Sequence, residues 1–202
     1  VFVVPACCTS VIQSAFPFTA FATPCLNIAF EAAAAAASGV VAAYETRGLK
    51  DVTVLAWAGD GGTVDIGIQA LSGAAERGTN FIYVCYDNEA YGNTGFQRSG
   101  ASPYGSRTTT TPTGKKEHKK DVPMIMMAHG IPYVATACVS YPLDFVSKLK
   151  KAKEMVGTKY IQILTPCPSG WRYSTEKTIE MGRLAVLTGV WALFEVEHGR
   201  FM

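Results

Sequence analysis

The sequence predicts an α/β protein with a doubly wound, mostly parallel sheet and helices on both faces. The first reason is rhythm, because short apolar runs alternate with longer segments of helical character, as in chains of βα units. The second is composition, since 49% of the 202 residues are hydrophobic and 17% are charged, which suits a chain with a large buried core. We expect residues 1–202 to form a single domain.

The strands are predicted from apolar runs that are too short for helices and are bounded by glycine, proline or polar residues. Each is short enough to be one buried parallel strand. In chain order they are Val1–Pro5, Val52–Ala58, Phe81–Tyr86, Tyr133–Ala137 and Tyr160–Leu164.

The helices are predicted from propensity and from their end signals. The six alanines at 32–37 favour a helix from Asn27 to about Tyr44. Asp65 is a candidate cap for a helix over Ile66–Arg77 that ends at Gly78. Further helices are expected at Val122–Ala128, at Pro142–Met155, which begins at its proline, and from Ser174 or Thr175 to Gly189.

A polar stretch from Phe96 to Lys120 interrupts this rhythm. It holds four consecutive threonines, Thr108–Thr111, and four lysines, Lys115, Lys116, Lys119 and Lys120. Long loops in small domains are disordered or functional. The lysines are therefore interpreted in two ways, as a solvated surface or as a site that attracts an anionic substrate or coenzyme A.

Glycines and oxygen ligands follow two neighbouring predicted strands. Gly59-Asp60-Gly61-Gly62 ends the first, and Asn88 lies just past the second. Parallel strands end at one edge of a sheet, where ligands bind in α/β proteins, and a carboxylate with an amide oxygen suits Mg²⁺ better than zinc. The alternative is that both strings are ordinary tight turns.

Composition excludes several other classes. A net charge of +2 gives no footprint for nucleic acid, and no uninterrupted apolar run approaches the ~20 residues of a membrane helix. The six cysteines form no Cys-x-x-Cys pair, and a disulfide framework is unusual for a chain of this size. We expect a cytoplasmic protein that contacts neither nucleic acid nor membrane.

The longer strings identify a family. GDGGTVDIGIQALSGAAERG followed by YDNEAYGNTGFQRS resembles the β chains of the pyruvate:ferredoxin oxidoreductases, which bind thiamine diphosphate. The resemblance implies that Asp60, Asn88 and the Ala90 carbonyl hold Mg²⁺, with Gly59, Gly61 and Gly62 beside the diphosphate. It also implies that Asn93 and Thr94 contact the cofactor, Asn93 closest to the chemistry.

The family also holds a four-iron four-sulfur cluster on four cysteines. Cys8 and Cys167, the latter within Thr-Pro-Cys-Pro, match two of them. The family's remaining Cys-x-x-Cys is absent from this sequence. The chain opens on Val1 without Met, so we expect that pair on an upstream segment, the alternative being that the cluster has been lost.

The implied activity is oxidative decarboxylation of pyruvate to acetyl-CoA and CO₂, with electrons passed to ferredoxin, in complexes with α and γ or δ subunits. The family's activating glutamate resembles a contribution from the α chain, so neither Glu31 nor Glu89 is assigned that role. Departures at Pro5–Cys8, Phe21–Cys25 and Gly92 leave oxalate, used without coenzyme A, as an alternative substrate. An alternative of another class is a noncatalytic nucleotide-binding module.

Overall fold

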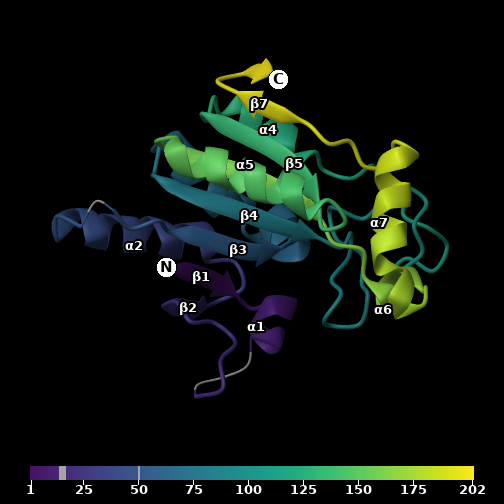
Figure 1. Cartoon of the computed structure of the whole chain (residues 1–202). Coiled ribbons are helices and arrows are strands. Elements are labelled where there is room, and N and C mark those ends of the chain that lie inside the picture. The colour runs from purple at the N-terminus through teal and green to yellow at the C-terminus, as the bar shows by residue number, and fades with distance from the viewer. Residues whose placement is uncertain (14–16, 50) are drawn as a thin grey trace.

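The computed structural model describes residues 1–13, 17–49 and 51–202. Its centre is one eight-stranded sheet, in which β1 to β6 run parallel and β7 and β8 are antiparallel additions at one edge (Figure 1). The spatial order is β2-β1-β3-β4-β6-β5-β7-β8. The strands are β1 Phe2–Pro5, β2 Cys25–Ile28, β3 Leu55–Gly59, β4 Phe81–Asp87, β5 Tyr133–Cys138, β6 Thr158–Leu164, β7 Glu195–Glu197 and β8 Arg200–Phe201.

Helices cover both faces of the sheet, as the sequence predicts. The helical segments are α1 Cys8–Ile12, α2 Ala33–Thr46, the π-helix η1 Gly61–Ile66, α3 Ile68–Glu76, α4 Val122–Ala128, α5 Pro142–Glu154, α6 Pro168–Trp171, the 3₁₀ turn η2 Thr175–Lys177 and α7 Thr178–Leu187. One face packs on α2, α3 and α4, and the other on α5. Figure 1 shows α5 in front of the sheet and α4 behind it.

Strand β4 shows why the sheet is two-sided. All seven of its residues are buried, and successive side chains point to opposite faces. Phe81, Tyr83 and Cys85 belong to the core under α2, α3 and α4, whereas Ile82 and Val84 belong to the core under α5. This strand therefore forms one continuous apolar run, the pattern of a central parallel strand.

The N-terminal prediction for a helix from Asn27 is wrong at its start. Residues Cys25–Ile28 form strand β2, which pairs in parallel with β1 from Phe2 to Pro5, and the helix begins only at Ala33. Backbone pairing with β1 outweighs local helix propensity here, because a sheet edge satisfies the donors and acceptors of the segment. Between β1 and β2 the chain also forms the short helix α1.

The expected cap at Asp65 is also wrong. Asp65 lies inside the π-helix η1, and α3 begins only at Ile68. A Cβ on Gly67 would collide with the carbonyl oxygen of Gly62, so the wide turn needs glycine at that position. Gly78, with φ +63, lies just after the end of α3, as expected.

The second half of the chain follows the sequence prediction closely. Helix α4 has the expected bounds, and α5 begins at Pro142. The last helix, α7, begins at Thr178, later than expected, because the 3₁₀ turn η2 follows Ser174, and Gly189 with φ +75 comes after it. The hairpin of β7 and β8 was not expected. In the described part of the chain, no helix combines the length and the apolarity that crossing a membrane requires.

Candidate functional site

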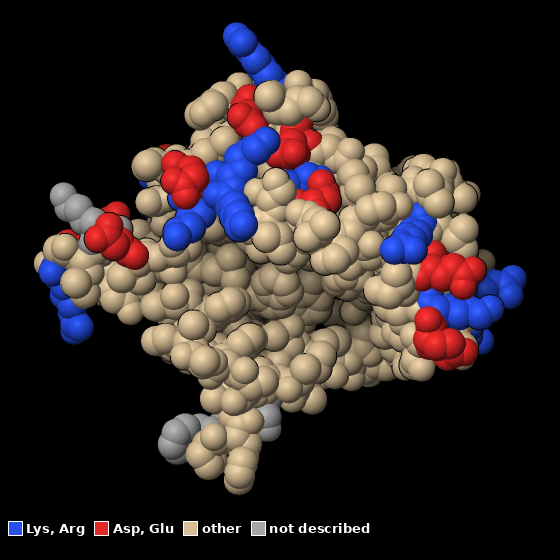
Figure 2. Space-filling model, viewed as in Figure 1, with Lys and Arg blue, Asp and Glu red and all other residues tan. Residues whose placement is uncertain are grey.

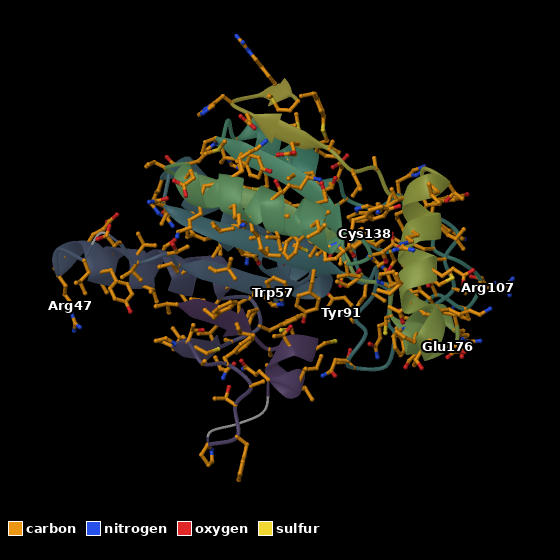
Figure 3. All side chains as sticks on the ribbon, viewed as in Figure 1. Arg47, Trp57, Tyr91, Arg107, Cys138 and Glu176 are labelled. Atoms are coloured by element: carbon orange, nitrogen blue, oxygen red, sulfur yellow. The ribbon has the colours of Figure 1, made fainter. Side chains whose placement is uncertain are left out.

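A cavity of about 270 Å³ lies at the carboxyl ends of β1, β3 and β4. Figure 2 shows the molecule hollowed right of its centre, in a region of this face with few charged side chains, and Figure 3 shows Trp57 and Tyr91 close to that place. The cavity brings together most of the predicted site residues. It is lined by Ala6, Cys7, Cys8, Ser10, Phe30, Gly59, Asp60, Gly61, Gly62, Tyr86, Asn88, Ala90, Tyr91, Gly92, Asn93 and Thr94.

Asp60 is an acid buried at the floor of this cavity. Asp60 is 2% exposed, and its Oδ2 accepts a 2.6 Å hydrogen bond from the Ser99 hydroxyl. Burial raises the pKa of Asp60 well above its usual range, the nearby charge of Asp87 raises it further, and the hydrogen bond from Ser99 opposes the shift. A buried carboxylate without a cation is costly, so this group is suited to a positive ligand.

The Asn88 side chain is placed by a tight turn after β4. Asp87 Oδ1 accepts from the Glu89 amide at 2.8 Å, and Asn88 Oδ1 accepts from the Ala90 amide at 3.1 Å. Glu89 has φ +65, in the left-handed region. The interpretation of Asp-Asn as a turn is therefore correct, and the same turn brings Asn88 and Ala90 to the cavity that Asp60 lines.

The glycines leave room for close backbone approach. A Cβ on Gly61 would overlap the Tyr91 ring, and one on Gly62 would lie 3.1 Å from the Phe30 ring. At Gly92, a Cβ would lie 2.9 Å from Asn88 Nδ2. Gly92 thus preserves space for the amide of Asn88.

Asn93 and Thr94 form the exposed rim of the cavity. The Thr94 hydroxyl donates to Gln97 Oε1 at 2.6 Å, and the Gln97 amide donates to the Thr94 carbonyl at 2.9 Å. These contacts hold the Asn93-Thr94 turn over the floor formed by Asp60. Both residues therefore line the same cavity as Asp60.

Cys8 follows the carboxyl end of β1 and Cys167 follows the carboxyl end of β6. Only Cys8 lines the cavity. Burial raises the pKa of the Cys8 thiol, and charges on Cys7, Cys167 and Asp60 raise it further. Cys7 lies beside the Tyr86 hydroxyl. Within residues 1–13, 17–49 and 51–202, no group of three or more His, Cys, Asp or Glu side chains is arranged to hold a metal.

Three of the four lysines in the run make contacts within the protein itself. Lys115 is 2% exposed and donates to the Ser102 carbonyl at 2.6 Å. Lys119 pairs with Glu89 at 3.1 Å, and Lys120 pairs with Asp65 at 3.3 Å. Only Lys116 stays on the exposed surface without such a contact in the described residues. Through these contacts, Lys115, Lys119 and Lys120 hold the loop 96–120 against the rest of the protein.

Sequence reasoning missed Ser99 and Ser102 as parts of the site. Ser99 is separated from Asp60 by 39 residues and Ser102 from Glu89 by 13, within a loop that has no periodic pattern. The only available signal was the position of Ser99 inside the string that resembles the family. Serine in a polar loop gives no sign of burial, yet both residues are fully buried.

The residues fit a diphosphate held through a divalent metal. A buried carboxylate, an amide side chain and a backbone carbonyl, from Asp60, Asn88 and Ala90, provide oxygen ligands of the kind Mg²⁺ prefers. Next to Asp60, Gly61 and Gly62 have no side chains, so the backbone itself forms the cavity wall there.

Comparison with known proteins agrees with this geometry. Residues 6–163 match the family of thiamine pyrophosphate enzymes, C-terminal TPP binding domain. The chain is 57% identical over 199 residues to pyruvate synthase subunit PorB of Methanothermobacter thermautotrophicus, covering 96% of this chain and 69% of the relative. It is 51% identical over 211 residues to ketoisovalerate oxidoreductase subunit VorB of Pyrococcus abyssi, covering 100% and 68%.

A solved structure agrees as well. The 2-oxoglutarate:ferredoxin oxidoreductase from Magnetococcus marinus, with 2-oxoglutarate, coenzyme A and succinyl-CoA bound, superposes with a TM-score of 0.76 at 27% identity. The match covers 90% of this chain and 58% of that one. The chain therefore belongs to the thiamine pyrophosphate enzyme family and, within it, to the PorB-type β subunits of the 2-oxoacid:ferredoxin oxidoreductases.

Proposed function

We propose that this chain holds thiamine diphosphate and Mg²⁺ in the cavity beside Asp60, as the β subunit of an enzyme that oxidatively decarboxylates pyruvate. The observation that carries the proposal is the convergence of Asp60, Asn88 and the Ala90 backbone on one cavity at the strand ends. Pyruvate is the preferred substrate because the PorB relative at 57% identity is named a pyruvate synthase subunit. The VorB relatives make ketoisovalerate the next candidate.

The roles of the residues follow from their places. Asp60, Asn88 and the Ala90 carbonyl bind Mg²⁺, and Gly61 and Gly62 allow the diphosphate to approach the backbone. Asn93 and Thr94 contact the cofactor from the rim. When bound, thiamine diphosphate supplies the carbanion chemistry of decarboxylation. The protein contributes orientation, and the Phe30 and Tyr91 rings form an apolar part of the cavity wall.

Electron transfer requires further groups. We propose that Cys8 and Cys167 are two ligands of a four-iron four-sulfur cluster at this edge of the sheet, and that its other two sulfur ligands come from outside the described residues. Coenzyme A, ferredoxin and the α and γ or δ subunits complete the proposed reaction. The named relatives favour this function over the oxalate enzyme and over a noncatalytic nucleotide-binding module.

Calorimetry on the complete enzyme tests the cofactor site. With Mg²⁺ present, the wild-type protein should bind thiamine diphosphate, and Asp60→Ala should abolish that binding because the buried metal carboxylate is lost. Asp51→Ala is the matched control and should bind normally. It removes an exposed acid near the amino ends of the strands, away from the cavity. Equal affinity in the Asp60→Ala and wild-type proteins would show that the metal lies elsewhere.

A further inference from the structure

We infer that the turn Ser99–Ser102, named here the serine turn, is the positioning element of the metal site, and that Ser99 orients the Asp60 carboxylate. This inference rests on the proposed function, because it concerns how that site holds Mg²⁺. The serine turn lies in the long loop after β4 and makes hydrogen bonds to both strand ends that carry the proposed ligands.

The Ser99 hydroxyl can point its proton in one direction only. Its Oγ accepts a hydrogen bond from the Ala101 amide at 3.2 Å and lies 2.6 Å from Asp60 Oδ2. A carboxylate only accepts, so the hydroxyl is the donor to it. Ser99 is 0% exposed, so bulk water does not compete for this proton. One oxygen of Asp60 is thereby fixed, and the rotation of the carboxylate is restricted.

Ser102 makes the corresponding contact on the other side. Its hydroxyl donates to the Glu89 carbonyl at 2.5 Å and accepts from the Ser99 amide at 2.9 Å. Glu89 lies between Asn88 and Ala90 and has the left-handed φ of +65. A non-glycine residue in that region costs free energy unless its surroundings hold it. The two serines therefore join the Asp60 end of β3 to the Asn88–Ala90 turn after β4.

The serine turn is itself held from behind. The Gly100 amide donates to Asp65 Oδ2 at 2.9 Å, and the buried Lys115 ammonium donates to the Ser102 carbonyl at 2.6 Å. The Lys120 amide donates to the Gly100 carbonyl at 2.9 Å. Because these contacts fix the serine turn, its hydrogen bond can hold the Asp60 carboxylate in one orientation.

Removing such a partner of a metal ligand lowers metal affinity by about 10–100-fold. The probe is Mn²⁺, bound to the complete enzyme with thiamine diphosphate and followed by electron paramagnetic resonance. We expect Ser99→Ala to raise the Mn²⁺ dissociation constant by about 10–100-fold. At saturating Mn²⁺, the affinity of this variant for thiamine diphosphate should return to the wild-type value. A merely structural role would lower cofactor affinity at every Mn²⁺ concentration.

Controls separate this inference from the proposed function. Ser106→Ala removes a hydroxyl of the same loop that bonds only the Pro103 carbonyl in the described residues, and it should leave both affinities unchanged. If Asp60→Ala loses Mn²⁺ while Ser99→Ala binds it like the wild type, the inference is overturned and the proposed function stands. If Asp60→Ala binds Mn²⁺ normally, both fail. Should Ser99→Ala not fold, Ser102→Ala replaces it, with the same expected loss of Mn²⁺ affinity and the same overturning result.

Discussion

At the scale of single residues, Cys8 and Cys167 make the account of electron transfer testable. They come from opposite halves of the chain and lie close enough that a charge on Cys167 raises the pKa of the Cys8 thiol. A cluster needs thiolates, so bound iron must overcome this unfavourable environment. In the anaerobically purified complete enzyme, Cys8→Ser or Cys167→Ser should reduce the iron and the reducible cluster signal measured by electron paramagnetic resonance.

The matched control for that experiment is Cys25→Ser. Cys25 is also partly exposed, but its thiol bonds to Gln13 Oε1 at 3.2 Å in the N-terminal edge region. Its replacement should leave the iron content unchanged. If Cys8→Ser and Cys167→Ser keep the full iron content of the wild type, these cysteines are not cluster ligands.

The sequence reached some of these residues and missed others for a physical reason. Asp60 and Asn88 could be predicted to meet because each directly follows a strand, and neighbouring parallel strands end together. Ser99 and Lys115 could not, because their burial depends on how an aperiodic loop folds back. Sequence spacing places residues on regular elements, and it gives no such rule for a loop.

At the scale of elements, the loop 96–120 supports the site from outside the cavity, through the hydrogen bonds of Ser99 to Asp60 and of Ser102 to Glu89. Gly100 is the most closely packed of its glycines, since a Cβ there would lie 2.5 Å from Asp65 Oδ1 and 2.8 Å from Val64 Cγ1. Gly100→Ala should therefore displace the serine turn and destabilise the protein by about 1–3 kcal/mol. Limited trypsin digestion should then cut faster after the exposed Arg107.

Gly39→Ala is the control for this loop variant. Gly39 lies in α2, and a Cβ added there would have no atom within 4 Å, so alanine should stabilise the helix by about 0.5–1 kcal/mol. Digestion after Arg107 should not change in this control. Unchanged digestion in Gly100→Ala as well would mean that the loop does not depend on its contact with Asp65.

The errors among the elements have one origin. Strands β4 to β6 are buried along their whole length, and each contains an apolar run that is visible in the sequence. Strand β2 is an edge strand with two exposed residues, Leu26 and Asn27, so its sequence carries little of that signal. The π-helix η1 depends on the fit of Gly67 against the Gly62 carbonyl, which is a tertiary contact that local propensity does not report.

At the scale of the whole molecule, we propose that the chain provides one wall of a larger active site. The cavity opens at the sheet edge, and its rim residues Asn93 and Thr94 are exposed. The chain spans 69% of the length of the PorB relative from Methanothermobacter thermautotrophicus, and such relatives are subunits by name. This arrangement is consistent with an enzyme that completes its site with other chains.

The most direct test of the central claim is a crystal structure of the complete enzyme with thiamine diphosphate and Mn²⁺, using the anomalous signal of the metal. We expect one strong peak in this cavity, in contact with a carboxylate oxygen of Asp60, the Asn88 side-chain oxygen and the Ala90 carbonyl. A cofactor-bound Mn²⁺ peak away from these three groups would contradict it.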